Sequence, residues 1–428
     1  MKKFFTIICL AVSVKSFSQN PAPAAPEKDA ILIMNGTAHI GNGQVIQNSV
    51  IGIKDGKLIV VGDATRIKIN KGEYPVIVDA FGKHVYPGFI DCNSTLGLTE
   101  IDLVRSTRDF NEVGELNPNV RSIIAYNTDS KITPTVRSNG VLLAQIVPDG
   151  RIITGQSSVV ELDAWNWEDA AYKTDDGIHI NWPRMYIVLN AEEKEDAQRQ
   201  KIQTNLNAIE QLLSEAKAYS MTKNPIEKNI RFESMKGLFD GGKKLYVHCD
   251  YVKEIVSSVN MIKQFGVKMV LVGGSDSYMV TDLLKSANVA VILGRTHSLP
   301  AREDDDVDLP YKLPYILKQA GITYAISVDG SWQVRNLMFN AGTSSGYGLT
   351  KEEALTSITE SPAKILGIDD RAGTLETGKD ATLFISDGDA LDMRTNNVMH
   401  AFIRGKEINL DNVQKQLYNK YMSKYKLN

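Results

Sequence analysis

The sequence has no excess of basic residues, little cysteine and no long hydrophobic run beyond its first residues. Its 428 residues include 48 Lys and Arg against 51 Asp and Glu, so the net charge of −3 points to neither nucleic acid nor an anionic membrane. Three cysteines exclude a disulfide scaffold, and no stretch after the N-terminus reaches the ~20 apolar residues of a membrane span. With 43% hydrophobic residues the chain is globular, and its binding energy must come from a shaped pocket.

The N-terminus is similar to a secretory signal peptide. Lys2-Lys3 precedes an apolar run at residues 4–14, and a Ser-Phe-Ser sequence that resembles a cleavage site ends at Ser18. We expect the mature chain to begin at Gln19 and to be exported, either to a periplasm or out of the cell. The alternative is a buried N-terminal helix or strand.

Strand-like apolar runs alternate with helical patterns through the middle of the chain. The expected strands are residues 89–91, 141–147, 159–162, 185–189, 245–249, 269–272, 289–293 and 324–328. The expected helices are residues 197–220, 252–265, 280–287, 313–320 and 334–341. Such alternation implies a parallel sheet, and eight strands would close a (β/α)₈ TIM barrel of ~250 residues. We therefore predict an α/β barrel over residues 85–367, although the run at 185–189 could also open a helix.

Both ends of the chain carry short strands separated by turns. Lys54-Asp55-Gly56-Lys57 is typical of a β-hairpin turn, and strands recur at residues 381–385 and 400–403. The simplest arrangement is one small composite β-sandwich domain built from both chain ends. The expected order is a signal peptide over 1–18, a linker over 19–29, the composite β-domain over 30–84 and 368–408 around the barrel, and a C-terminal helix over 409–428.

A series of motifs gives a resemblance to a known family. The series consists of Gly56-Lys57-Leu58, Val85-Tyr86-Pro87-Gly88-Phe89-Ile90-Asp91, Asn336-Leu337, Asn340-Ala341, Gly348-Leu349, Glu353-Ala354-Leu355, Thr359, Pro362-Ala363-Lys364-Ile365-Leu366-Gly367, Gly373-Thr374-Leu375-Glu376 and Gly378-Lys379-Asp380-Ala381-Thr382-Leu383. Over residues 30–407 it resembles the amidohydrolase superfamily, and within it the imidazolonepropionase-like amidohydrolases. The resemblance implies a metal-binding (β/α)₈ barrel with a composite β-domain. It also implies hydrolysis of C–N bonds in cyclic amides, ureas or dipeptides.

The metal-ligand positions of that family are only partly kept. The family places His-x-His on strand one, one histidine each on strands five and six, and an aspartate on strand eight. Here Asn93 and Thr95 stand at the two lost histidine positions, and strand six ends in Ser275-Asp276. His248 stands at the strand-five position and Asp329 at the strand-eight position. A catalytic zinc with three protein ligands is therefore not visible in the motif.

His297 follows the seventh expected strand and could replace a lost ligand. His248, His297 and Asp329 would form a His₂-carboxylate set for one divalent cation, with Zn²⁺ expected. We take Asp329 and His248 as the candidate catalytic residues, with Asp329 accepting a proton from the attacking water or, without a metal, binding a substrate amine. The alternative is a loop histidine at 297, a hydrogen-bonded core histidine at 248 and a turn aspartate at 329.

Four further residues are candidate substrate contacts at the barrel rim. Arg151, in a segment that also resembles this subgroup, could bind a carboxylate, and Glu100 follows strand one. Asp276 follows strand six, and His179 falls in an expected loop over residues 177–183.

Cys92 and Cys249 are each one residue away from a ligand position. Side chains alternate along a strand, so both thiols should point outward, and strands one and five lie far apart in the ring. A disulfide requires Cα atoms within about 7 Å, so we predict two free, buried cysteines.

Two functions remain open. The first is an exported hydrolase of a small amide, cyclic amide or dipeptide, with an altered or mononuclear metal site. The second is a non-catalytic barrel that binds a ligand or serves as the partner subunit of an intact amidohydrolase, because fold alone does not imply activity. A metal-free enzyme with Asp329 as base beside His248 is a third alternative. The substrate partner is a small molecule, and a homo-oligomer or hetero-oligomer is compatible with both main functions.

Overall fold

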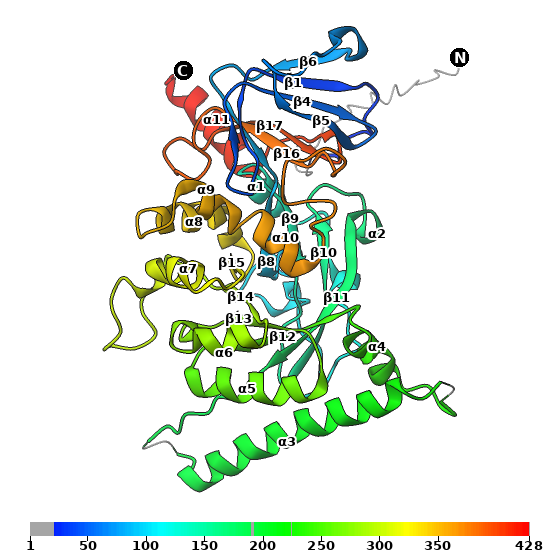
Figure 1. The fold of residues 1–428 in the computed structure, drawn as a ribbon, viewed down its shortest axis with the longest axis vertical. Coiled ribbons are helices and arrows are strands. Elements are labelled where there is room, and N and C mark those ends of the chain that lie inside the picture. Colours follow the sequence, from blue (N-terminus) through cyan, green and yellow to red (C-terminus); the bar gives the residue numbers. More distant parts are fainter. Residues whose placement is uncertain (1–20, 190–191, 224, 428) are drawn as a thin grey trace, which may run out of the picture.

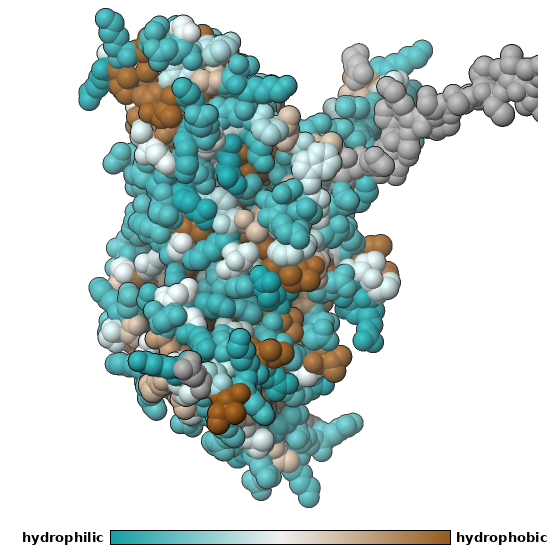
Figure 2. Space-filling model, turned by 90° about the vertical axis from the view of Figure 1, so that its right-hand side faces the viewer, coloured by the Kyte–Doolittle hydropathy of each residue, from teal (hydrophilic) through white to brown (hydrophobic). Residues whose placement is uncertain are grey.

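The structure is a computed structural model that describes residues 21–189, 192–223 and 225–427. The expected signal peptide and its cleavage site lie outside these residues. Within them, no helix is both long and apolar enough to cross a membrane. The face seen in Figure 2 is mostly hydrophilic, with its hydrophobic residues in small separate groups apart from one larger group at the upper end.

Eight strands form the barrel that the sequence predicts. In chain order they are β8 (Phe89–Ser94), β9 (Val141–Ile146), β10 (Ile153–Glu161), β11 (Ala171–Asn181), β12 (Lys244–Cys249), β13 (Met269–Gly273), β14 (Ala290–Leu293) and β15 (Tyr324–Ile326). They follow one another in the sheet in the same order. Seven run parallel, whereas β10 pairs antiparallel with both β9 and β11. The fold is therefore an α/β barrel with one reversed strand.

The third and fourth expected strands were misplaced. The expected strand at 159–162 is only the end of β10, and the run at 185–189 is irregular chain. The fourth strand is β11, which carries Asp175, Asp176 and Gly177 in its middle. These residues break the apolar pattern that marks a buried strand, which is why the sequence did not reveal it.

Asp91 ties the first barrel strand to the last. Its Oδ1 accepts a hydrogen bond of 3.0 Å from the backbone N–H of Val328, just after β15. Ser94 Oγ and the Thr95 N–H both donate to the Gly330 carbonyl, each at 3.0 Å. These contacts bring the end of β8 next to the segment that carries Asp329.

Helices cover the outside of the barrel (Figure 1). They are α1 (Thr133–Arg137), α2 (Trp167–Ala170), α3 (Glu195–Ser220), α4 (Ile230–Phe239), α5 (Val252–Phe265), α6 (Thr281–Ser286), α7 (Leu309–Ala320), α8 (Leu337–Ser345), α9 (Lys351–Thr356) and α10 (Glu360–Leu366). Helix α5 shows the local logic: its apolar residues Ile255, Val259 and Ile262 recur at helical spacing and are buried. Gly266 then ends it in the left-handed conformation, which glycine adopts without a steric penalty.

Strands from both chain ends form the second unit, at the top of Figure 1. One sheet has β5 (Lys57–Asp63), β4 (Ser49–Lys54), β1 (Ile31–Met34) and β6 (Val76–Asp79) in that order. The other has β18 (Lys406–Glu407), β17 (Val398–Ile403), β16 (Leu383–Ser386), β7 (His84–Pro87), β2 (Thr37–His39) and β3 (Val45–Ile46). Buried residues of both sheets, such as Ile33, Ile51 and Leu383, form one core, so the unit is a composite β-sandwich.

Two local expectations at the chain ends are confirmed. Asp55 and Gly56 both have positive φ, at 52° and 75°, and join β4 to β5 as the hairpin turn that the sequence predicts. The C-terminal helix is α11 (Val413–Tyr425), none of whose residues is fully buried.

Candidate active site

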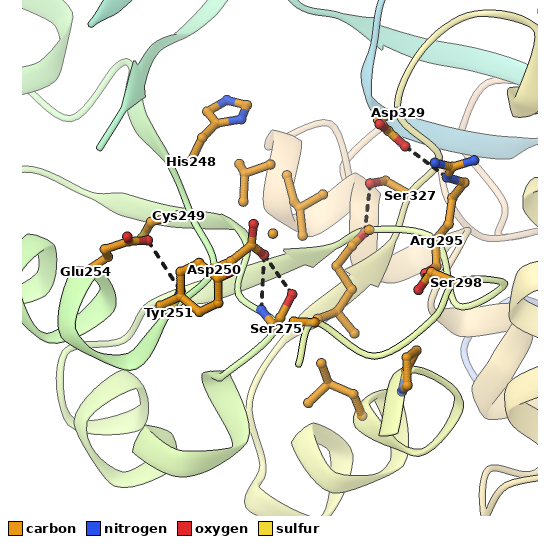
Figure 3. A pocket seen from close by; sticks show the side chains of 18 of the residues that line it. His248, Cys249, Asp250, Tyr251, Glu254, Ser275, Arg295, Ser298, Ser327 and Asp329 are labelled. Carbon is orange, nitrogen blue, oxygen red and sulfur yellow. Dashed lines mark hydrogen bonds and ion pairs between the residues drawn. The ribbon is translucent and has the colours of Figure 1, made fainter. Parts of the chain in front are cut away.

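A cavity of about 680 Å³ opens at the carboxyl ends of the barrel strands, and we call it the mouth cavity. Barrel enzymes place their chemistry at this end. Its polar and charged walls come from residues at or after the ends of β8, β11, β12, β13, β14 and β15, and they include Asn93, Asn181, Arg184, His248, Asp250, Glu254, Ser275, Arg295, Thr296, Ser298, Asp305, Ser327 and Asp329. Figure 3 shows His248 on one side of this cavity and the Arg295–Asp329 pair on another.

His248 lies at the end of β12, as predicted, but its ring is not free. Its Nε2 lies 2.8 Å from Nδ1 of His179, in the neighbouring strand β11. Burial lowers the pKa of His248 to about 4, and burial followed by the nearby His248 lowers the pKa of His179 well below its usual value. Both imidazoles are therefore neutral near pH 7 and share one hydrogen between these two nitrogens.

Behind the two histidines lies a buried polar network. The His179 ring stacks on Tyr246 at a centroid distance of 4.6 Å, and Tyr246 donates a 2.7 Å hydrogen bond to Asp176. Asp176 also accepts hydrogen bonds from Ser157 at 2.7 Å and from Gln145 at 2.9 Å. Four adjacent strands thus fill the barrel interior with mutually satisfied polar groups, which fixes the orientation of the histidine pair.

His179 is not in a loop, as the sequence suggested, but within β11. It has no exposed surface and lies behind His248 instead of in the cavity wall. Its Nε2 is buried without a hydrogen-bond partner among the described residues. An unpaired acceptor costs less than an unpaired N–H, so we assign the shared hydrogen to Nδ1 of His179, which donates to Nε2 of His248.

Asp329 projects from the segment after β15 into the mouth cavity. Its Oδ1 forms an ion pair of 3.2 Å with Nε of Arg295, which follows β14. The two side chains are 62% and 44% exposed, so both remain accessible to a ligand. Asp329 was predicted from the family's aspartate position at the end of strand eight, whereas Arg295, which no motif marks, was not predicted.

Asn93 and Thr95 lie at the end of β8, where the lost histidines would stand. Asn93 lines the mouth cavity in a left-handed conformation, with φ of 58°, and its N–H donates to Gln145 Oε1 at 3.3 Å. Amide and hydroxyl side chains are weak zinc ligands compared with imidazole.

The expected ligand set of His248, His297 and Asp329 is not brought together. His297 Nε2 lies 2.6 Å from the Thr343 hydroxyl of α8, and His297 is absent from the cavity wall. In the described part of the chain, no group of three or more His, Cys, Asp or Glu side chains is arranged to hold a metal ion. The residues present therefore do not fit the cation site expected from His248, His297 and Asp329.

Arg151 and Glu100 also lie outside the cavity wall. Arg151 is 73% exposed and forms a 3.0 Å ion pair with Glu115. Glu100 accepts hydrogen bonds from Asn127 Nδ2 at 3.3 Å and from the Lys131 N–H at 3.2 Å, which hold together the loops beside β8.

Asp276 holds two loops together. Its side chain is 2% exposed and accepts hydrogen bonds from both terminal nitrogens of Arg302, at 2.8 and 3.0 Å. It also accepts a 2.9 Å hydrogen bond from the Val252 N–H at the start of α5. Arg302 belongs to the segment 294–308, which includes Leu299, Pro300 and Ala301 of the cavity wall, so Asp276 anchors this wall from behind.

An aromatic wall completes the cavity and was not predicted. Trp182, Tyr186 and Tyr251 line it, and the two tyrosines meet edge to face at a centroid distance of 5.5 Å. Trp182 and Tyr186 follow β11, so placing that strand correctly would have brought them to the rim.

Cys92 and Cys249 are both free and buried, as predicted. Burial raises the pKa of Cys249 to about 12 and that of Cys92 well above its usual value, so neither is a thiolate near pH 7.

Comparison with known proteins identifies the family. The family model described as "Amidohydrolase family" matches residues 195–408, half of the chain. The imidazolonepropionase of Rhizobium rhizogenes is 23% identical over 376 residues, covering 81% of this chain and 88% of that protein. The imidazolonepropionase of Shewanella baltica is 30% identical over 207 residues, covering 47% of this chain and 43% of that protein.

Solved structures show the same fold. An amidohydrolase from Thermotoga maritima superposes with a TM-score of 0.76 at 23% identity, covering 88% of this chain and 99% of that chain. A Xaa-Pro dipeptidase with bound methionine gives a TM-score of 0.54 at 13% identity, covering 88% of this chain and 99% of that chain. The motifs, the barrel and these matches agree, and the chain belongs to the amidohydrolase family, with imidazolonepropionases among its relatives.

Proposed function

We propose that this chain is an exported hydrolase that cleaves a C–N bond of a small amide, cyclic amide or dipeptide in the mouth cavity. One observation carries the proposal: in a barrel of the amidohydrolase family, His248, Asp329 and Arg295 from three different strand ends line one cavity of about 680 Å³. Such a volume suits a small molecule, and binding sites of this kind combine apolar walls with a few polar groups.

The Arg295–Asp329 pair supports a substrate with polar ends. The guanidinium can bind a carboxylate in two-point fashion, and the carboxylate can bind an amine. Two structural neighbours hold amino-acid-like ligands, a Xaa-Pro dipeptidase with methionine and a prolidase with N-methylphosphonate-L-proline. A dipeptide or its cyclic analogue would present the same groups here.

The proposed chemistry uses residues of the chain. Asp329 accepts a proton from the water that attacks the substrate carbonyl carbon and then donates that proton to the amine nitrogen as the C–N bond breaks. His248, neutral near pH 7, hydrogen-bonds to the bound substrate and is held in place by His179. His179 is in this scheme a positioning residue.

Members of the amidohydrolase family usually use a divalent cation, which activates water and polarises the carbonyl. The residues at this mouth do not fit a three-ligand cation site, since Asn93 and Thr95 replace two histidines and His297 points to Thr343. The proposed steps therefore rest on side chains of the chain alone.

The lack of a fitting three-ligand site among the described residues favours a second candidate function, a non-catalytic barrel. The mouth cavity would then bind its small ligand without turnover, and the chain could act as the partner subunit of an intact amidohydrolase in a homo-oligomer or hetero-oligomer.

Turnover of a substrate panel separates the two functions. We would assay small amides, cyclic amides and dipeptides with the purified protein, with Asp329→Asn, and with Asp370→Asn as an exposed control outside the cavity. The hydrolase requires turnover that falls about 100-fold or more in Asp329→Asn, the usual effect of losing a general base, and that survives in Asp370→Asn. Saturable binding that Arg295→Gln weakens, with no turnover of any panel member, would instead support the second function.

The proposed export has its own test. Expression of the full chain in a Gram-negative host, followed by N-terminal sequencing of the periplasmic and medium fractions, should give a chain that begins at Gln19. An uncleaved N-terminus in the cytoplasmic fraction would contradict it.

A further inference from the structure

A second cavity, of about 600 Å³, lies at the opposite end of the barrel. We call it the basal cavity. It is lined by the first residues of β12, β13 and β14, the residues before β15, and the last turns of α5, α6 and α10. The mouth cavity uses the carboxyl ends of β12, β13 and β14 and the segment after β15, so the two cavities are separated by the length of the barrel.

Five lysines line the basal cavity, and no Asp or Glu is among its described lining residues. The lysines are Lys244, Lys263, Lys268, Lys285 and Lys364. Only Lys364 forms an ion pair among the described residues, at 2.9 Å to Glu360. The cavity therefore concentrates positive charge in a chain whose net charge is −3.

Two of the remaining lysine side chains donate hydrogen bonds to backbone carbonyls, and the other two have no partner among the described residues. Lys244 Nζ donates to the Lys364 carbonyl at 3.2 Å and also to the Ile365 carbonyl, and Lys268 Nζ donates to the Gly241 carbonyl at 3.3 Å. The ammonium groups of Lys263 and Lys285 make no hydrogen bond or ion pair with the described residues. Both are exposed at the rim, where an anion could reach their ammonium groups.

The electrostatics of Lys244 agree with this picture. The pKa of Lys244 is lowered to about 8, chiefly by burial. The charges of Lys173 and Lys268 also lower it, whereas those of Asp176 and Asp369 raise it. Nearby positive charges thus contribute to the lowered pKa of Lys244, and a bound anion would offset their repulsion.

We propose that the basal cavity binds a small molecule with a diphosphate or triphosphate group, with Lys263 and Lys285 as the accessible contacts and Lys244 at the inner wall. Lysine is a common phosphate ligand, and several ammonium groups around one concave site favour clustered phosphates over a single one. The proposal does not depend on the reaction at the mouth cavity.

Helix stability offers a competing explanation for some of these lysines. Lys263, Lys285 and Lys364 lie in the last turns of α5, α6 and α10, where a positive charge complements the helix carbonyls. This role does not explain Lys244 and Lys268, which belong to strands or the residues before them. It also predicts a loss of stability without any ligand binding, which an experiment can separate.

Titration calorimetry with inorganic tripolyphosphate tests the proposal. The purified protein should bind one tripolyphosphate per chain, and more tightly than inorganic phosphate. Lys263→Gln/Lys285→Gln should weaken binding about tenfold or more, because two charge-assisted contacts are lost. The control pair Lys420→Gln/Lys424→Gln removes the same charge from α11 and should leave the affinity unchanged.

Three results would overturn the proposal. They are no saturable binding to the unaltered protein, an equal loss of affinity in both double variants, and a lower melting temperature in Lys263→Gln/Lys285→Gln with unchanged affinity. The last result would assign these lysines to the helix ends alone.

Discussion

Nδ1 of His179 lies 2.8 Å from Nε2 of His248. His248 stands at a family ligand position, and here its Nε2 forms a hydrogen bond with another imidazole. The contact joins β11 to β12 and is partly buried, with His179 fully enclosed and His248 facing the mouth cavity. Behind this pair, Asp176 accepts hydrogen bonds from Tyr246, Ser157 and Gln145.

This histidine pair predicts a loss of stability in acid. Unfolded histidine has a pKa of about 6.5, whereas the folded pKa of His248 is about 4 and that of His179 is also lowered. Between these values the unfolded chain binds more protons, so the stabilisation is complete above about pH 6.5 and is lost as the pH falls through about 4. Urea unfolding at pH 7.5, 6 and 5 should show a falling free energy of unfolding.

The matched variants for this test are His179→Asn/His248→Asn and His400→Gln. The double variant should flatten the pH dependence between 7.5 and 5. His400 lies in β17, outside the barrel and outside this pair, so His400→Gln should change the slope less than the double variant does. An unchanged slope in the double variant would refute the assignment.

Metal analysis tests the misfit of the cation site. Mass spectrometry of untagged protein, purified without chelators and incubated with Zn²⁺, should find well below one equivalent of zinc, because three suitable side chains do not converge in the described residues. Near-stoichiometric zinc that disappears in His248→Ala would show that the chain rearranges around a cation.

We expect the protein to tolerate the substitution Asp91→Asn. Burial raises the pKa of Asp91 well above its usual value, which favours the neutral carboxyl group that an amide resembles in charge and shape. A raised folded pKa gives stability that is full below about pH 4 and is lost as the pH rises through the folded value. Asp91→Asn should remove this dependence and keep the Val328 hydrogen bond. Asp91→Ala should cost about 1–3 kcal/mol in denaturant unfolding, because the Val328 N–H loses its acceptor.

Arg302 should hold the outer wall of the mouth cavity. Arg302→Ala leaves the buried Asp276 carboxylate without its charge partner, and we expect a loss of about 1–3 kcal/mol, less than for a fully buried pair because Arg302 is 33% exposed. Hydrogen exchange followed by mass spectrometry should show faster exchange over residues 294–308. The exchange rate of Arg302→Lys should lie between those of the unaltered protein and Arg302→Ala. An unchanged exchange rate in Arg302→Ala would contradict the anchoring role.

Most of the fold was accessible from the sequence because its signals are local. Periodic apolar residues marked α3, α5 and α7, and the Asp55-Gly56 turn marked a hairpin. Strand β11 was not accessible, since its polar middle is stable only through partners on three other strands, such as Tyr246 for Asp176.

Residues of the site could be predicted from the sequence only where the end of a strand fixes their position. His248 and Asp329 follow from that rule, and both line the mouth cavity. The roles of Arg295 and Asp276 depend on pairs between loops, Arg295 with Asp329 and Asp276 with Arg302, and no spacing in the sequence encodes such contacts. His297 has the right place along the chain, but its side chain bonds to α8.

The sheet shared by the two chain ends also constrains how the protein is made. Val85 in β7 pairs with Ile385 in β16, so β7 lacks this neighbour until nearly the whole chain has left the ribosome. The unpaired edge and the apolar face of the first strands must wait through synthesis of the entire barrel, a period in which such surfaces attract other chains. A chain that passes a membrane before folding would avoid this delay, because both ends would then become available together.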